Sequence, residues 1–579
     1  MLNFRKPVIS DRDWITNCIN EGDTDGCCYC FGNLIAWGDA YSLEVCEFEG
    51  MCLMRSVGKR GTSYAFPSGK GDIKKAVTAM MKQAEENGEL FRMHHVLENN
   101  KKALEEMFPG EFEFRYSRDT SEYVYSVKNM AELPGKKFHG KKGHVNAFFR
   151  KHADVVCDPI TEDNIHICLE IAQSWMTGRE DDYGELQDEY NALSNSVKYF
   201  SQLGLIGAIL YADGKPVAFT MGEELKNNTF CTHYEKTIPE YRDAFPVINN
   251  GFTKLMLLSY DYVNREEDTG SEGLRKAKLS YYPDFLLDKY SASLKNDPAR
   301  KYYADENDYP ELKNLWKTVF GDEDDVIDYF YKNTVNASEI YAYRKDGRIV
   351  SAFYLIDSSV TDKNKKLNAK YLYAAATLPE YRRNGIMGEM IKYAADYCRK
   401  RNNDMIFLYP ADDALYNYYA KLGFKPMFSE RYYIIEKKEI EKYKGQRYFN
   451  AALSYDRMRE YVPAESFASF DCRYTDFARF LARKYGFEIC ATFDDEDSVF
   501  VIGTKKDNRI VIDEAISSDG NYAHILSLIA DTDAEAFVLK TPADIELPFE
   551  NEIKKAGMLL PLSENIPGNE KIYLGQPCM

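Results

Sequence analysis

The sequence predicts an α/β protein that contains several mixed-sheet units. At roughly 100–200 residues per domain, a chain of 579 residues has room for three or four compact units. One order of elements, in which paired strands are followed by a long helix and a further strand, recurs three times after residue 150. This order is typical of a sheet that contains both antiparallel hairpins and parallel crossovers.

The first two copies of the pattern each contain a hairpin signal. In the first copy the sequence pattern predicts a helix at 162–175, strands at 205–211, 216–222 and 229–235, and a helix at 247–262. In the second it predicts helices at 309–320 and 325–333, strands at 339–343, 348–355 and 370–376, a helix at 388–400, a strand at 404–408 and a helix at 413–422. Asp213-Gly214 and Asp346-Gly347 each stand between two apolar runs, as in a tight β-hairpin.

The C-terminal segment 441–579 repeats the order with a helix at 476–485, strands at 489–493, 498–503 and 509–515, a helix at 522–529 and a strand at 536–540. At the junction before the helix 522–529, Asp519 would repel a diphosphate, since a helix N-terminus binds anions only where no carboxylate competes. We therefore expect this unit to be structural, or to line an acceptor site.

The lengths of the apolar runs and the use of cysteine indicate the compartment in which the protein works. The longest apolar runs are far shorter than the ~20 residues that cross a bilayer, and the N-terminus lacks the apolar run of a signal peptide, so we expect a cytoplasmic protein without membrane insertion. Thirteen cysteines without an export signal indicate reduced thiols, and the CxxC spacing at Cys27 and Cys30 has no second ligand pair at the usual distance, so no metal site is expected.

The net charge of −18 disfavours nonspecific binding to nucleic acid. The segment 136–151 differs from this acidic balance, because it carries six Lys or Arg residues and no Asp or Glu. This segment is either a local phosphate-binding patch or a solvated linker.

The strongest motif is Arg382-Arg383-Asn384-Gly385-Ile386-Met387-Gly388, which follows a predicted strand and opens a predicted helix. A helix N-terminus presents free backbone N–H groups, glycine allows close approach, and arginine adds positive charge, so this loop is suited to a diphosphate. It resembles motif A of the GNAT acetyltransferases, Arg/Gln-x-x-Gly-x-Gly/Ala, and among them the mycobacterial aminoglycoside acetyltransferases. The final small residue of the pattern falls on Met387, with Gly388 one position later.

A second motif follows at the expected distance. The segment 415–424 looks like motif B of the same family, in which a tyrosine lies four residues before a glycine; here these are Tyr419 and Gly423. The resemblance implies that acetyl-CoA is the acyl donor, that residues 382–388 and the backbone near Ala376 and Thr377 bind it, and that Tyr419 protonates the thiolate leaving group. Taken alone, Tyr419 could equally be an aromatic residue of an amphipathic helix.

No residue stands out as the general base. Glu380, Asp412 and Asp413 are candidates by position, and each could instead be a helix cap or a surface carboxylate.

The segment 1–297 carries a longer resemblance. The segments 25–37, 133–148, 217–223, 233–236, 241–252, 264–268 and 273–283 look like the catalytic domain of phosphatidylglycerol lysyltransferases, which has two fused GNAT-like halves and moves an aminoacyl group from tRNA. His233 and Glu235 alternate onto one strand face and could bind an amine or relay a proton, or the histidine could simply be buried and satisfied by that glutamate. Arg275, Lys276 and Lys278 are candidates for contacts with donor phosphates, or belong to an internal ion-pair network.

The two resemblances together imply four GNAT-like units in two fused pairs, with boundaries at 1–150, 151–297, 298–440 and 441–579. The leading hypothesis is an acetyl-CoA-dependent N-acetyltransferase whose acceptor is a small-molecule or peptidic amine. One alternative is an aminoacyl-tRNA-dependent transferase centred on the first half. Another is a protein that senses acyl-CoA without turnover.

Overall fold

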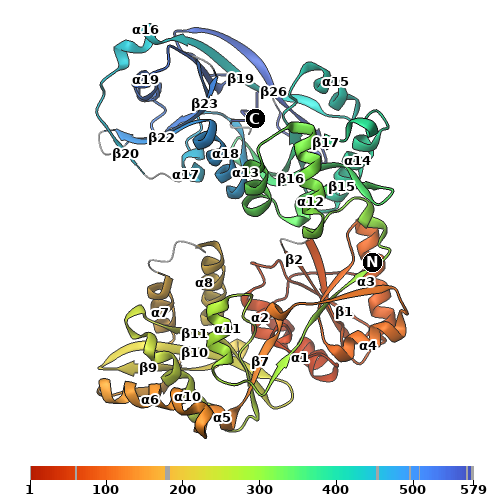
Figure 1. Ribbon diagram of the computed structural model, residues 1–579, viewed down its shortest axis with the longest axis vertical. Helices are drawn as coiled ribbons and strands as arrows, with labels where there is room; N and C mark the ends of the chain where they lie inside the picture. The colour runs from red at the N-terminus through yellow and green to blue at the C-terminus, as the bar shows by residue number, and fades with distance from the viewer. Residues whose placement is uncertain are drawn as a thin grey trace. The chain divides into compact units, whose positions relative to one another are not determined.

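The computed structural model describes residues 2–58, 61–176, 183–451, 455–493, 497–506, 509–568 and 571–575. The chain forms two compact units, Met1–Pro298 and Ala299–Met579 (Figure 1). Each is a mixed α/β structure, which confirms the predicted fold class. No helix in the described ranges combines the length and the apolar character that a membrane crossing requires.

The first unit contains two seven-stranded sheets. The first sheet follows the order β1-β2-β3-β5-β14-β6, with β4 paired to β2. Its strands are β1 (Glu44–Phe48), β2 (Met51–Gly58), β3 (Gly61–Ala65), β4 (Ser68–Gly69), β5 (Arg92–Val96), β6 (Phe112–Tyr116) and β14 (Tyr290–Leu294). The helices of this part are α1 (Arg12–Glu21), α2 (Phe31–Ala36), α3 (Ile73–Asn87) and α4 (Glu98–Met107).

The second sheet follows the order β13-β7-β12-β11-β10-β9-β8. Its strands are β7 (Glu122–Ser126), β8 (Val156–Pro159), β9 (Ile206–Ala212), β10 (Lys215–Leu225), β11 (Thr229–Thr237), β12 (Tyr262–Asn264) and β13 (Phe285–Leu287). Its helices are α5 (Val127–Glu132), α6 (His139–Lys151), α7 (His166–Met176), α8 (Tyr183–Lys198), α9 (Phe200–Leu203), α10 (Phe245–Met256) and α11 (Glu272–Leu279). The basic segment predicted as a patch or a linker thus forms η4 (Lys136–Phe138) and helix α6.

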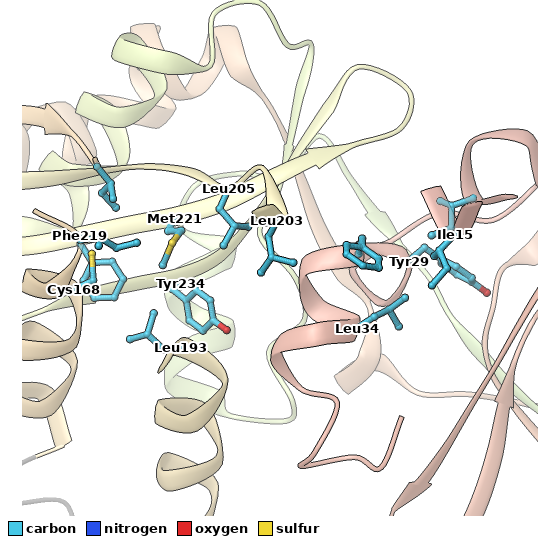
Figure 2. Close-up of a cluster of buried hydrophobic side chains, with 14 of the residues drawn as sticks. Ile15, Tyr29, Leu34, Cys168, Leu193, Leu203, Leu205, Phe219, Met221 and Tyr234 are labelled. Carbon is cyan, nitrogen blue, oxygen red and sulfur yellow. The ribbon is translucent and has the colours of Figure 1, made fainter. Parts of the chain in front are cut away.

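One apolar core joins elements of both sheets in the first unit. Figure 2 shows Ile15 of α1 and Leu34 of α2 in the same cluster as Leu203, Phe219 and Tyr234, which come from the part of the chain that builds the second sheet. All five are buried. Burial of apolar area stabilises at about 25 cal/mol per Å², so this core holds α2 and the loop before it against the second sheet.

The second unit is built on a single twelve-stranded sheet, in the order β15-β16-β17-β18-β26-β19-β25-β24-β23-β22-β20, with β21 paired to β16. The strands are β15 (Ile340–Lys345), β16 (Arg348–Asp362), β17 (Lys365–Thr377), β18 (Met405–Leu408), β19 (Lys425–Glu436), β20 (Tyr448–Asn450), β21 (Ser466–Phe470), β22 (Gly486–Phe493), β23 (Asp497–Lys506), β24 (Arg509–Ser517), β25 (Ala536–Pro542) and β26 (Glu550–Pro561). The strands of the segment 441–579 therefore extend the sheet of residues 299–440 through β26, which pairs with both β18 and β19.

The helices of the second unit are α12 (Tyr309–Phe320), α13 (Asp324–Tyr329), α14 (Ile386–Lys400), α15 (Asp413–Lys421), α16 (Lys437–Ile440), α17 (Tyr455–Arg459), α18 (Cys472–Tyr485) and α19 (Tyr522–Ala530). α18 packs beside the early part of the unit: Tyr329 stacks on Phe480 with ring centroids 4.1 Å apart. The division into four units at 150, 297 and 440 stays a prediction.

Candidate active site

The loop before α14 has two residues with a left-handed backbone conformation. Gly385 is the N-cap of α14 with φ +76°, and Arg383 also has a positive φ of +65°. A Cβ at Gly385 would meet no atom within 4 Å, so the loop is open on that side. Because the first N–H groups of a helix have no partner within it, the amides of Ile386, Met387 and Gly388 are free to bind an anion here.

The side chains around this loop leave its charge balance positive. Arg382, Arg383 and Asn384 are exposed, and Nε of Arg382 donates to the carbonyl of Thr377 at 3.0 Å, which ties the loop to the end of β17. The carboxylate of Glu389, in the first turn of α14, is paired with Nζ of Lys301 at 2.9 Å and with the hydroxyl of Tyr302 at 2.6 Å. This carboxylate is therefore screened from an anion at the helix terminus.

The pairing of β17 with β18 ends before β17 reaches the loop. β17 and β18 pair in parallel over Ala369–Met405 to Tyr371–Phe407, and within the described segment 365–408 the pairing ends there while β17 continues to Thr377. Ala374 has φ +48° at an irregularity of the β16–β17 register, which bends β17 at this point. The hydroxyl of Ser351 donates to the carbonyl of Ala376 at 2.8 Å and lies 2.8 Å from the hydroxyl of Thr377.

Helix α15, which carries Tyr418 and Tyr419, contacts the start of α14. A Cβ at Gly388 would lie 3.3 Å from Cδ2 of Leu422 and 3.9 Å from the hydroxyl of Tyr418, so the two helices touch there. Tyr419 is 7% exposed, and its ring contacts those of Tyr418 and Phe424. Burial raises the pKa of Tyr419, which keeps the phenol protonated and able to act as an acid.

Among the candidates for the general base, Asp412 is a helix cap. Its Oδ1 accepts the N–H of Leu415 at 2.8 Å at the start of α15, while Glu380 and Asp413 are exposed.

Sequence reasoning missed the buried carboxyl group of Glu430 on β19, which is 1% exposed and accepts the N–H of Gly575 at 3.1 Å. Burial raises the pKa of Glu430 to about 8. Apart from its place after the second motif, nothing in the sequence distinguishes it.

In the first unit, His233 and Glu235 do not pair with one another. Nε2 of His233 lies 2.9 Å from Oε1 of Glu223 and its Nδ1 lies 2.8 Å from Oε1 of Glu266. Glu235 instead accepts from Arg265 at 2.7 Å and from Asn249 at 2.9 Å. Burial alone would lower the pKa of His233, but Cys231 and the two glutamates raise it well above its usual value.

The three basic candidates of α11 differ in their contacts and in their exposure. Arg275 donates to both oxygens of Asp268 at 2.8 Å and to Asp119 at 2.5 Å. Lys278 is buried, and its Nζ donates to backbone carbonyls of the segment 265–267. Of the three, only Lys276 is exposed, so the structure does not bring these side chains to a common surface.

A further buried ion pair lies beside this network. Nζ of Lys289 lies 2.8 Å from Oε1 of Glu122 and 3.4 Å from Oε2 of Glu267. Burial would lower the pKa of Lys289, but the two carboxylates raise it well above its usual value. The sequence gives no signal for this pair because its members are up to 167 residues apart.

The two units match different protein families. Residues 21–293 match the family described as phosphatidylglycerol lysyltransferase, C-terminal, and residues 302–427 match the acetyltransferase (GNAT) domain. Among curated proteins, an uncharacterized protein of Mycoplasmoides gallisepticum is 24% identical over 176 residues, which is 30% of this chain. The chain spans 55% of the length of that relative.

Three solved structures illustrate the likeness. A conserved protein of unknown function from Bacteroides thetaiotaomicron is 35% identical, with 51% of this chain and 100% of that chain covered and a TM-score of 0.49. L-PGS of Bacillus licheniformis is 14% identical over 50% of this chain and 93% of that one, with a TM-score of 0.38. A GCN5-related N-acetyltransferase of Kribbella flavida is 14% identical over 45% and 71%, with a TM-score of 0.36.

The chain therefore carries a domain of the phosphatidylglycerol lysyltransferase C-terminal type over residues 21–293 and an acetyltransferase domain of the GNAT type over residues 302–427.

Proposed function

We propose that the second unit is an acetyl-CoA-dependent N-acetyltransferase that acts on a small or peptidic amine. The observation that carries this proposal is the open N-terminus of α14 at Gly385, which follows the part of β17 that is not paired with β18 and contacts the helix that carries the buried Tyr419. The diphosphate of the donor would lie on the free amides of the helix start, where a helix binds anions.

Acyl transfer from the thioester to the amine then needs only a few groups of the protein. The pantetheine arm would run along the end of β17 that is not paired with β18, with backbone groups near Ala376 and Thr377 holding the thioester in register. The neutral amine attacks the thioester carbon, a C–N bond forms, and the C–S bond breaks as the intermediate collapses. Tyr419, which burial keeps protonated, gives its proton to the departing thiolate from its position on α15. The proton that the amine nitrogen loses passes to solvent, and the phenolate of Tyr419 takes up a proton from solvent in turn.

Calorimetric titration of the folded protein with acetyl-CoA tests this proposal. We expect saturable binding with a dissociation constant below about 100 μM, equivalent to roughly 5.5 kcal/mol or more. The Gly385→Glu variant should lose this binding, since the new carboxylate would face the diphosphate. A folded wild-type protein that gives no binding heat at several times that concentration would contradict the proposal.

A second candidate, aminoacyl transfer from tRNA by the first unit, is favoured by the family match over residues 21–293. The exposed lysines of α6 would then contact the phosphates of the acceptor stem. Filter binding of charged tRNA should weaken by about 10³-fold between 50 and 200 mM salt if six or so phosphates are contacted. Binding that is absent or independent of salt would remove this candidate.

A further inference from the structure

We propose that Cys30, Cys231, His233 and Glu266 form a structural zinc site in the first unit. The proposal does not depend on the acyltransferase activity, which we place in the second unit. It also departs from the expectation drawn from the CxxC spacing, because Cys27 and Cys30 belong to different groups of candidate ligands.

Three donor atoms already lie close together, and a fourth contacts two of them. The sulfurs of Cys30 and Cys231 and a ring nitrogen of His233 all lie within 4.8 Å of one another. Oε1 of Glu266 lies 3.9 Å from Sγ of Cys231 and 2.8 Å from Nδ1 of His233. In a tetrahedral zinc site with bonds of about 2.0–2.3 Å the ligand atoms are about 3.3–3.8 Å apart, so the two sulfurs and the nitrogen would draw together by up to about 1 Å and the Glu266 carboxylate would turn toward Cys30.

The donor set matches what zinc prefers. Thiolates and imidazole, with a carboxylate as a fourth ligand, are typical of zinc rather than of magnesium or calcium. Cys30 and Cys231 are 2% and 0% exposed, and they pack with Cys27 and Leu225. On binding, the two thiols and Nδ1 of the imidazole each release a proton, and the four ligands with the ion carry a net charge of about −1.

The outer contacts would hold these ligands in place. With Nδ1 on the metal, Nε2 of His233 donates to Glu223 at 2.9 Å, the carboxylate–histidine arrangement that fixes the ring in zinc sites. Glu223 in turn accepts the N–H of Gly32 at 2.8 Å. Nδ2 of Asn33 donates to Glu266 at 3.0 Å, which orients the carboxylate that completes the site.

Two other groups of candidate ligands in the described ranges suit a metal less well. In the cluster of Cys27, Glu122 and Glu267 the Nζ of Lys289 already supplies the positive charge, at 2.8 and 3.4 Å from the carboxylates. In the cluster of Asp497, Asp519 and His524 the carboxylate of Asp519 is engaged by Ser517 and by the N–H of Asn521, and the residue is exposed. Of these three groups in the described part of the chain, the one around His233 alone combines two buried thiols with an imidazole.

Such a site would tie together three separate stretches of the first unit. Cys30 is the residue before α2, Cys231 and His233 share one face of β11, and Glu266 follows β12. The first of these stretches is far from the other two along the chain. Four protein ligands leave no open position, so the ion would stabilise the fold and would not activate water.

Metal analysis of the full-length protein tests the site. We expect about one zinc per chain after purification and dialysis, and less than about a tenth of that in Cys231→Ala and in Cys30→Ala. Cys168→Ala is the matched control, because Cys168 is also a fully buried thiol of the first unit but lies outside the cluster. Retention of zinc by Cys231→Ala, or a folded wild type that takes up no zinc, would overturn the proposal.

A second measurement does not depend on the variants folding. Wild-type protein reconstituted with Co²⁺ should show the charge-transfer absorption of thiolate-bound cobalt, and zinc should protect Cys30 and Cys231 from alkylation as mapped by mass spectrometry. The alkylation of Cys28, which packs against the apolar core around Ile15 and Leu34, should not change. A Cys30–Cys231 disulfide in protein purified without reductant, with zinc absent, would also overturn the proposal.

Discussion

Arg473 of α18 donates two hydrogen bonds of 3.0 Å to the two carboxylate oxygens of Glu339, the residue before β15. The side chain of Glu339 is 4% exposed and that of Arg473 is 23% exposed. Burial raises the pKa of Glu339, while Arg473 acts to lower it. The pair joins the C-terminal segment 441–579 to the beginning of the shared sheet.

Removal of the arginine should destabilise the second unit. Arg473→Ala leaves a buried carboxylate without its partner, which costs about 2 kcal/mol or more and should lower the melting temperature by about 4–8 °C. Arg483→Ala on the same helix is the control, because Arg483 is 60% exposed and its ion pair to Glu488 contributes little. Equal effects of the two substitutions would contradict the structural role of the Glu339 pair.

The helix start at Gly385 should control donor affinity. Gly385→Glu is expected to raise KM for acetyl-CoA about tenfold or more, roughly 1.4 kcal/mol, because a carboxylate and a Cβ would stand where the amides meet the diphosphate. Gly347→Glu is the matched control: its φ of +79° and its open surroundings are those of Gly385, but it lies in the β15–β16 turn. Steady-state kinetics of both variants separates backbone strain from loss of the anion site.

Tyr419 should affect turnover and leave affinity nearly unchanged. Tyr419→Phe removes only the hydroxyl, so kcat should fall by about 10²–10⁴-fold while the dissociation constant for CoA stays within about twofold. Tyr416→Phe on the same helix is the control, because the Tyr416 hydroxyl makes no hydrogen bond within the described residues, and this variant should turn over at close to the wild-type rate. Normal turnover by the Tyr419 variant would show that this residue serves packing alone.

The buried carboxyl of Glu430 should make stability fall with rising pH. Its pKa of about 8 in the folded protein exceeds the ordinary value of 4.5, so the folded state binds more protons than the unfolded state across that range. The free energy of unfolding therefore falls by at most about 1.4 kcal/mol for each pH unit up to pH 8.

Thermal unfolding from pH 6 to pH 8 measures this effect. Glu430→Gln should gain stability over wild type as the pH rises, since the amide cannot ionise. Glu552→Gln, at an exposed position of β26, is the control and should follow the wild type at every pH. A Glu430 variant that parallels the wild type would contradict the raised pKa.

Local patterns predicted much of the fold. The helix expected at 309–320 is α12, and the two Asp-Gly hairpins stand where their turn residues place them, as β9–β10 and β15–β16. These features depend on neighbours in sequence, for which helix periodicity and turn chemistry suffice. The loop at Gly385 belongs to the same class, since strand, glycine and helix are contiguous.

Contacts over long sequence distances could not be predicted in this way. β19 and β26 pair at Lys425 and Leu559, and no local signal announces a partner so distant along the chain. His233 was expected to be satisfied by Glu235 if it was buried, yet its partners are Glu223 on β10 and Glu266 after β12. The side-chain alternation of one strand places residues on a face but does not say what the next strand brings to it.

The most direct test of the account is the release of free CoA thiol from acetyl-CoA by the wild-type protein in the presence of a panel of amines that includes polyamines, aminoglycosides and peptide N-termini. We predict that at least one amine raises the rate above the amine-free rate, and that this increase is lost in Gly385→Glu but kept in Gly347→Glu. Saturable binding of acetyl-CoA with no release above the amine-free rate for any amine would contradict catalysis and would identify the second unit as a sensor of acyl-CoA.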